Sequence, residues 1–170
     1  MGGESSVSGF TLIELIVLIA VLAIVTAIGV PMISSFLAND QTQAAAGRFQ
    51  QNMQWARAEA IKTNQTVSVT ISGASTTNCA WTITAANASR TPEQSASDFQ
   101  NHYPGVGCAV TSTDLCFSPL GNLGTGTGCQ PGGTYTFDNK SPGSNQWLVI
   151  VSAGGEISSC LQGKTAGQCQ

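Results

Sequence analysis

The sequence predicts an α+β protein, in which a long N-terminal helix packs against a C-terminal antiparallel β-sheet domain. Three observations support this prediction. The segment Leu15–Ile33 carries no charged residue, residues 45–60 repeat apolar side chains at helical spacing, and from Thr66 onward the apolar period changes to two. One continuous helix covered on one side by a sheet accounts for all three.

The first half of this helix is long enough to cross a membrane. At about 1.5 Å per residue, Leu15–Ile33 spans roughly 28 Å, which is close to the thickness of a bilayer core. Pro31 lacks a backbone N–H and clashes with the preceding turn, so we expect a kink or a loosened turn around Thr26–Pro31, aided by Gly29.

The second half of the helix is amphipathic and ends near Lys62. Its apolar residues recur every three or four positions, which places them on one face, and we expect the globular domain to cover that face. These residues are Ala45, Phe49, Met53, Ala56 and Ala60. The polar residues expected on the other side are Arg48, Asn52, Glu59 and Lys62.

The remaining chain alternates short strand patterns with loops rich in Gly, Pro, Ser and Asn. Thr66–Ile71 and Cys79–Thr84 flank a Gly73–Asn78 turn and predict a β-hairpin. The later strand candidates are Ala109–Thr111, Leu115–Ser118, Thr134–Phe137, Gln146–Val151 and Glu156–Cys160. Together these strands predict the antiparallel sheet.

All six cysteines lie beyond the apolar segment, at Cys79, Cys108, Cys116, Cys129, Cys160 and Cys169. An even number in an exported domain predicts disulfides, and six cysteines allow about 15 pairings. We place Cys160 with Cys169 first, closing a short C-terminal loop, and then pairs among the other four. A zinc site is disfavoured, because the chain has no C-x-x-C pair and His102 is its one histidine.

The charge balance argues against nucleic acid as a partner. Six Lys and Arg face nine Asp and Glu, the isoelectric point is near 4.8, and no basic cluster occurs. Only 9% of the residues are charged, which suits an exported subunit packed among neighbours better than a cytosolic enzyme, although a free secreted domain would also fit. The sequence contains no catalytic motif of nucleophile, base and orienting residue, so we expect neither an enzyme nor a cofactor. We expect His102 to lie in a loop.

The most informative stretch runs from Gly9 to Glu14, because it puts a carboxylate at the start of a segment built for lipid. A charged side chain in a membrane helix costs roughly 2.5–3.5 kcal/mol, so Glu14 should have a partner. Cleavage between Gly9 and Phe10 would create an α-amino group about one turn away, and a neighbouring copy can offer the same amine. An ordinary secretory signal is removed together with its apolar core, whereas cleavage here would leave the apolar segment in the product.

This stretch resembles the class III signal and N-terminal helix of type IV pilins and of the pseudopilins of type II secretion. The resemblance covers Gly9–Pro31: Gly before Phe, the string FTLIE, an apolar run and a proline. It implies that Gly9 is the last leader residue and Phe10 the N-methylated first residue of the mature chain. It also implies that Glu14 guides subunit docking and that Pro31 loosens the helix. The leader departs from the family pattern, because Glu4 is its one charged side chain and the usual Lys or Arg is missing.

A second resemblance covers the rest of the chain. Ala56–Ile61 match the A-R-S/A-E-A-I/V motif that closes the helix in the FimT/FimU/GspH group of minor pilins and pseudopilins, and Leu148–Val151 followed by Gly154–Ile157 also look like that group. From the residues alone, Arg57 and Glu59 fit either a subunit contact or a solvated helix end. Glu59 and Lys62 can also form an i,i+3 pair.

The resemblance implies a minor type IV pilin that primes pilus assembly at the filament tip. The alternatives are an H-type minor pseudopilin of type II secretion and a DNA-binding minor pilin for natural transformation. DNA-binding relatives carry G-R-x-R near the C-terminus, where this chain has Gly155-Glu156-Ile157-Ser158. An anion and a serine replace the two arginines, so DNA binding is disfavoured.

The expected organisation follows from the same resemblance. Residues 1–9 form the prepilin leader, residues 10–33 the transmembrane and assembly half of the helix, and residues 34–170 the exported globular domain. The expected location is the bacterial inner membrane, crossed once with the globular domain in the periplasm, and later the extracellular pilus. The expected partners are other major and minor pilin subunits, the prepilin peptidase, the inner-membrane assembly platform and, before assembly, the membrane.

Overall fold

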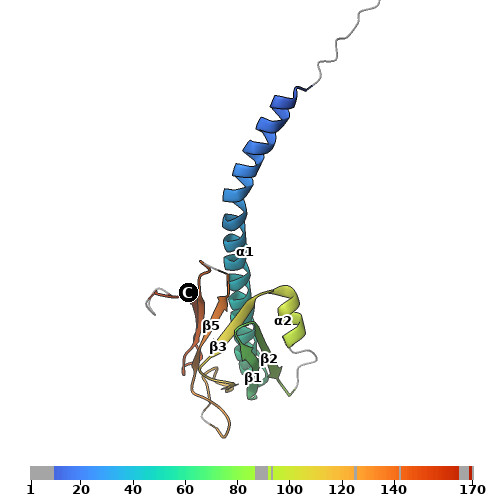
Figure 1. The fold of residues 1–170 in the computed structure, drawn as a ribbon. Coiled ribbons are helices and arrows are strands. Elements are labelled where there is room, and N and C mark those ends of the chain that lie inside the picture. Colours follow the sequence, from blue (N-terminus) through green and yellow to red (C-terminus); the bar gives the residue numbers. More distant parts are fainter. Residues whose placement is uncertain are drawn as a thin grey trace, which may run out of the picture. The chain divides into compact units, whose positions relative to one another are not determined.

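The computed structural model describes residues 10–86, 92, 94–124, 126–141, 143–164 and 169, without the side chains of residues 30–32. The chain divides into two compact units, one up to Ser34 and the other from Ser35 onward. In chain order (Figure 1) the elements are α1 (Leu12–Thr63), β1 (Val67–Ser75), β2 (Asn78–Thr84), α2 (Ala96–His102), β3 (Val106–Val110), β4 (Asp114–Phe117), β5 (Gly133–Asn139), β6 (Trp147–Val151) and β7 (Ile157–Leu161).

The predicted apolar face of α1 is confirmed, because its members are fully buried: Ala45, Phe49, Met53, Ala56 and Ala60. The prediction for the other side of the helix is partly wrong. Arg48 and Lys62 are exposed, but Asn52 and Glu59 are buried. Glu59 tolerates burial because Lys62 Nζ lies 3.1 Å from its Oε2. The globular unit therefore covers more of α1 than one narrow face.

The end of α1 is set by local backbone geometry. Asn64 takes a left-handed conformation with φ of 54°, which Asn adopts more readily than most residues. The Gln65 N–H then donates to the Ala60 carbonyl over 3.2 Å, and the Asn64 N–H donates to the Ile61 carbonyl. These bonds satisfy carbonyls that the helix end would leave unpaired and turn the chain into β1.

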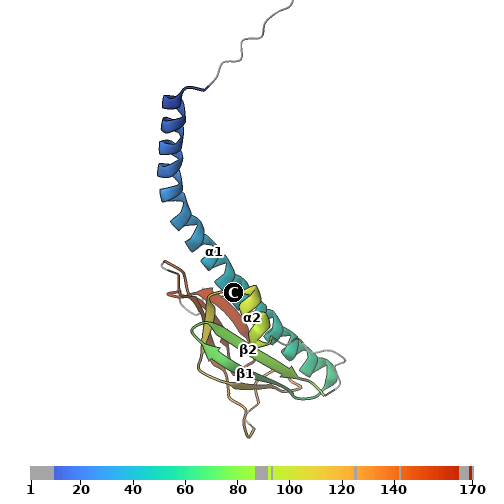
Figure 2. The same ribbon diagram turned by 45° about the vertical axis from the view of Figure 1, so that its right-hand side comes forward.

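The strands form two antiparallel sheets that pack on the second half of α1 (Figure 2), so the predicted α+β fold is confirmed. One sheet has the order β2-β1-β4 and the other the order β3-β5-β6-β7. The five later strands lie close to their predicted positions. The hairpin turn is shorter than predicted: β1 continues through Gly73 to Ser75 and β2 begins at Asn78, so Thr76 and Thr77 make the turn. Gly73, with φ of 63°, lies where the register shifts and forms a bulge, not the turn.

Helix α2 was not predicted, and His102 lies in its last turn and not in a loop. The Ser95 side chain caps this helix by accepting the Asp98 N–H at 3.2 Å, and it donates to Asp98 Oδ2 at 2.6 Å. His102 Nδ1 lies 2.8 Å from the Asp98 carbonyl, which fixes the ring against its own helix.

Three disulfides join parts of the globular unit. Cys79–Cys108 links β2 to β3 and so ties the two sheets together, Cys116–Cys129 closes the loop after β4, and Cys160–Cys169 closes the C-terminal tail. The last bond is the pairing that we expected first from the sequence. Beside the first bond, the tip of the β1–β2 hairpin lies directly on β3. A Cβ on Gly107 would be only 2.2 Å from the Ser75 carbonyl oxygen.

The core is centred on Phe49. Its ring centroid lies 5.1 Å from that of Trp81 in one sheet, and 4.7 and 5.6 Å from those of Tyr135 and Phe137 in the other. Burial raises the pKa of Tyr135 above its ordinary value, and the Asp114 carboxylate raises it further, so the phenol stays neutral at physiological pH. One helical side chain thus contacts both sheets.

Replacing Phe49 by Ala should lower the free energy of unfolding by about 3–5 kcal/mol, because it leaves a cavity at the junction of three layers. Phe36, which is 73% exposed on the same helix, is the matched control, and Phe36→Ala should cost less than about 0.5 kcal/mol. Both variants of the full chain are unfolded with denaturant in mild detergent and followed by tryptophan fluorescence. Equal losses in the two variants would contradict the central role of Phe49.

Candidate functional site

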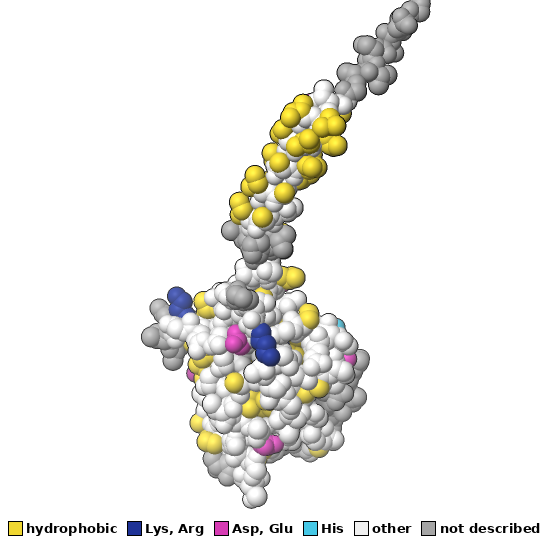
Figure 3. Space-filling view, viewed as in Figure 1, with side chains coloured by type: hydrophobic (Ala, Val, Ile, Leu, Met, Phe, Trp, Pro, Cys, Tyr) yellow, Lys and Arg dark blue, Asp and Glu magenta, His cyan; other side chains and the backbone are white. Residues whose placement is uncertain are grey.

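The first half of α1 exposes its large apolar side chains. From Phe10 to Ile28 every one of them is between 46% and 76% exposed, and they crowd one segment in Figure 3. Among the described residues, α1 is the one helix long and apolar enough to cross a membrane, and no part of its most apolar window is buried. A helix of a soluble core would be buried, so this surface needs a bilayer or other protein chains around it.

Glu14 lies at the start of this surface and forms a capping box with Thr11. The Glu14 N–H donates to Thr11 Oγ1 at 3.3 Å, while the Thr11 N–H and hydroxyl donate to Glu14 Oε2 at 3.3 and 3.2 Å. This cap was not predicted from the sequence, although T-x-x-E before an apolar run is its signal. The cap and the positive end of the helix dipole offset part of the cost of the carboxylate within its own helix.

The structure says less about the residues expected to act in cleavage and in helix bending. Gly9 lies outside the described residues, and Phe10 is 75% exposed. The backbone remains helical through Gly29 and Pro31, so the expected loosening there stays a prediction.

The motif at the end of α1 has a role within the globular unit. Arg57 Nε donates to the Gly121 carbonyl over 2.9 Å, and Glu59 is buried against Lys62. Neither Arg57 nor Glu59 is therefore a solvated residue at a helix end. Arg57 ties the helix to the loop that follows β4.

Gly155, in the turn between β6 and β7, is packed against the same loop. It has φ of +77°, and a Cβ on it would lie 1.8 Å from the Gly121 carbonyl oxygen. The Leu123 N–H also donates to the Ala153 carbonyl at 3.0 Å. We call this contact of Arg57, Gly121 and Gly155 the glycine clasp. The clasp explains why position 155 is a glycine, which the resemblance to the family did not explain.

The basic residues that the structure describes lie on α1 and after the ends of β5 and β7. Glu156 is exposed and Ser158 half-buried at the start of β7, and Lys62 is already paired with Glu59. On the face drawn in Figure 3 the blue side chains are few and separate. The described basic residues are Arg48, Arg57, Lys62, Lys140 and Lys164. This arrangement gives no row of cations for successive phosphates.

A polar hollow lies beside α2, and its described lining residues form no catalytic arrangement. It is lined by Arg48, Gln94, Asp98, His102 and Tyr103, and none of them is a serine or cysteine nucleophile that His102 could activate. In the part of the chain that the structure describes, no group of three or more His, Cys, Asp or Glu side chains could hold a metal ion. The geometry favours packing and docking over chemistry.

Comparison with known proteins agrees with this geometry. The family described as Type II transport protein GspH matches residues 45–155. The type IV minor pilin FimU of Pseudomonas aeruginosa (strain PAO1) has a similar structure, with a TM-score of 0.52 and 15% identity over 79% of this chain and 96% of FimU. The minor pseudopilin EpsH from the Type 2 Secretion System of Vibrio cholerae has a TM-score of 0.53 and 17% identity over 73% of this chain and 99% of EpsH. No curated protein sequence matches significantly. At these identities the structures show a shared fold.

The glycine clasp predicts a sharp difference between two adjacent glycines. Gly155→Ala should lower the free energy of unfolding by at least about 2 kcal/mol. The alanine would have to keep the left-handed backbone that glycine adopts here, and its methyl group would collide with the Gly121 carbonyl oxygen. Gly154→Ala is the matched control, because its Cβ would meet nothing closer than Ser152 Oγ at 3.8 Å. Denaturant unfolding of the two full-length variants measures the difference, and similar stabilities would rule out the clasp.

Proposed function

The chain belongs to the GspH family of type II transport proteins, and from this membership we propose that it is a minor type IV pilin that primes pilus assembly at the filament tip. The family membership and the pilin-like fold make it a minor pilin or pseudopilin, a structural subunit and not an enzyme. The specific role in a pilus is our proposal.

The observation that carries the proposal is the exposed apolar half of α1 with one capped carboxylate at its start. In our proposal Phe10–Val30 holds the subunit in the inner membrane, with the globular unit in the periplasm, until the assembly platform extracts it. The same apolar surface is then buried among the helices of other major and minor pilin subunits. Bilayer and filament core are interchangeable apolar solvents for this surface.

Glu14 has the task of setting register in this proposal. Its Oε2 accepts hydrogen bonds from Thr11, and in the described residues Oε1 has no hydrogen-bond partner. A prepilin peptidase would cleave after Gly9, and the methylated amine of Phe10 in a neighbouring subunit would pair with the carboxylate. A buried charge pair of this kind favours specific register more than stability. Gly29 and Pro31 would let the helix adjust during the transfer.

A second candidate is an H-type minor pseudopilin of a type II secretion system. The name of the matching family favours it, and EpsH resembles this chain as closely in fold as FimU does. A clean deletion separates the candidates when surface pili, DNA uptake and exoprotein secretion are scored in parallel. Loss of pili supports the proposal, loss of secretion alone supports the pseudopilin, and loss of DNA uptake with intact pili would promote DNA binding.

Cleavage after Gly9 is the first prediction from this proposal. Intact-mass and N-terminal peptide analysis of membrane-extracted or sheared protein should find a mature chain that begins with methylated Phe10. A chain that begins beyond Val30 would remove the apolar half and with it the pilin role.

Glu14→Val should leave membrane insertion intact and reduce recovery of the chain in sheared filaments by about tenfold or more, because the partner amine loses its carboxylate. Thr11→Val is the control: it removes the capping hydroxyl at a cost of about 1 kcal/mol but keeps the carboxylate, so it should assemble nearly as well as the wild type. Quantitative immunoblots of the sheared and cell-bound fractions measure both. If Thr11→Val fails as badly as Glu14→Val, the carboxylate acts through the cap and not through an amine.

A further inference from the structure

Two large apolar side chains lie exposed at the very start of the globular unit. Phe36 is 73% and Leu37 is 52% exposed, and they come directly after Ser35, the first residue of this unit. The next residue, Ala38, is buried. Phe36 and Leu37 thus form a small apolar patch, and its place in the chain indicates what covers it.

The patch is close to any bilayer that holds the apolar half of α1. Ile33 ends the segment expected to cross the membrane, and the four residues from Ile33 to Leu37 span about 6 Å as a helix. Even fully extended they would span at most about 14 Å. This limit holds for any orientation of the globular unit, because no linker separates the two units. The headgroup layer on each side of a bilayer is roughly 5–7 Å thick, so Phe36 and Leu37 are within its reach.

The loop between β5 and β6 is fixed to α1 at the same level as the patch. The Asn145 N–H donates to Asn39 Oδ1 over 2.6 Å, and Asn39 follows Leu37 by only two residues. Within the loop, the Ser144 hydroxyl donates to the carbonyl of the buried Asn139. The loop therefore has a defined place beside the patch.

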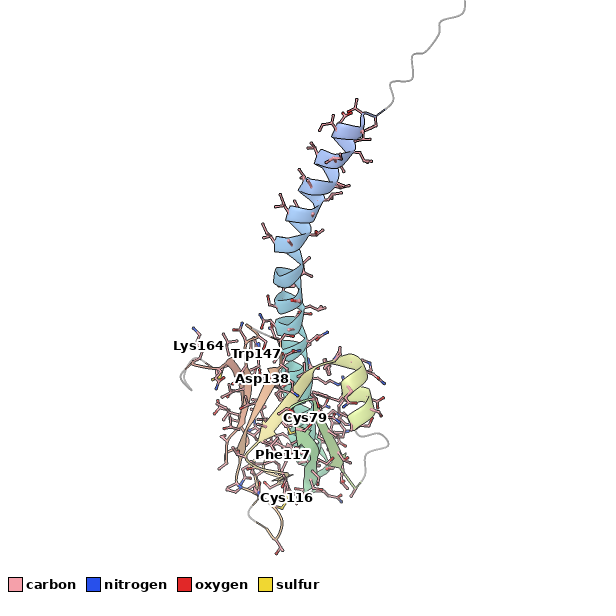
Figure 4. The ribbon with its side chains drawn as sticks, in the orientation of Figure 1. Cys79, Cys116, Phe117, Asp138, Trp147 and Lys164 are labelled. Atoms are coloured by element: carbon pink, nitrogen blue, oxygen red, sulfur yellow. A yellow bond between two sulfur atoms is a disulfide. The ribbon has the colours of Figure 1, made fainter. Side chains whose placement is uncertain are left out.

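Two exposed lysines lie near Gln146, the last residue of this loop. Lys140 lines a hollow together with Gln146. Lys164 follows the end of β7, where the Gln162 N–H donates to the Gln146 carbonyl over 2.8 Å. In Figure 4 Lys164 lies in the upper part of the globular unit, where the unit's part of α1 begins, and Phe117 lies lower. Both lysines are thus at the end of the unit that carries the patch.

The charges around the patch suit phospholipid headgroups. Lysine side chains are long enough to place their ammonium groups on lipid phosphates while the chain stays above the apolar layer. Two carboxylates accompany the lysines: Asp40 is exposed on α1, and Asp138 Oδ2 accepts a hydrogen bond from the Gln146 amide at 2.9 Å. Together these two lysines and two carboxylates carry no net charge. A headgroup that contains both a phosphate and an ammonium is complementary to such a set, whereas a nucleic acid offers phosphates alone.

We propose that this end of the globular unit rests on the bilayer before assembly, with Phe36 and Leu37 in the headgroup layer and with Lys140 and Lys164 on lipid phosphates. The loops of the sheet then supply a second anchor beside the one that α1 provides. Two anchors restrict the tilt of the globular unit, so the subunit meets the assembly platform in one orientation. This inference rests on the proposed function, because it requires the apolar half of α1 in a bilayer.

A photo-crosslink to lipid tests the contact directly. A benzophenone amino acid replaces the exposed Gln162 in the full-length chain, which is reconstituted into vesicles of phosphatidylethanolamine and phosphatidylglycerol. Irradiation should give a product that is heavier by one phospholipid, and the same probe at Phe36 should give it too.

The matched control carries the probe at Leu120, which is even more exposed, at 87%. Leu120 precedes Gly121, which packs against Ile61, and Ile61 lies roughly 33 Å along α1 from Asn39. A probe at Leu120 should therefore give no lipid product. Ile19, in the apolar half of α1, is the positive control.

Charge reversal gives an independent measurement with the probe kept at Gln162. Lys140→Glu combined with Lys164→Glu should lower the yield of the lipid product by about threefold or more, because each lysine near an anionic membrane surface contributes to binding. Arg48→Glu is the matched control, since it reverses an exposed charge elsewhere on α1, and it should leave the yield unchanged. Equal yields from the double variant and the control would overturn the inference.

The two proposals fail in different ways. A lipid product at Ile19 with none at Gln162, or equal products at Gln162 and Leu120, overturns the inference and leaves the proposed function standing. Absence of a lipid product at Ile19 as well overturns the membrane anchoring on which the proposed function depends.

Discussion

The globular unit depends on the insertion of Phe49 between two sheets. A helix or a sheet with one apolar face is stable only when another element covers it. Here the helix α1 and the two sheets meet at the side chain of Phe49. The ring of Phe49 contacts Trp81 on one side and Tyr135 and Phe137 on the other. The Cys79–Cys108 disulfide and the hairpin tip on Gly107 then fix how closely the sheets approach each other at their shared edge. The glycine clasp does the same at the end of the helix.

The helix face that makes this contact could be predicted from the sequence, because its spacing is strictly helical. The burial of Asn52 and Glu59 could not, since a sequence period reports one apolar face and not how many sheets surround a helix. Helix α2 was missed because Phe99 is its one buried residue and the Ser95 cap is a weak signal.

The candidate site shows the same division. Local signals mark out Gly9–Glu14, whose roles in processing and docking stay predictions. The capping box of Thr11 and Glu14, which the structure shows, could have been predicted from T-x-x-E. The contact of Gly155 with Gly121 could not be predicted, because it joins two loops that are distant in the sequence. Gly73 was assigned to a turn for a related reason: glycine permits a turn and a bulge equally well, and only the pairing of β1 with β2 decides between them.

A filament subunit also needs a defined position along its neighbours, and the apolar half of α1 cannot supply it alone. A helix that is apolar all round has no preferred rotation or height among other apolar helices. Position must then come from groups that bind in one place. We propose Glu14 as such a group, because its cap leaves one carboxylate oxygen without a partner in the described residues. A single polar group in an apolar helix, paired with one amine of a neighbour, would be enough to set the height of a subunit, because every other position leaves the charge without a partner.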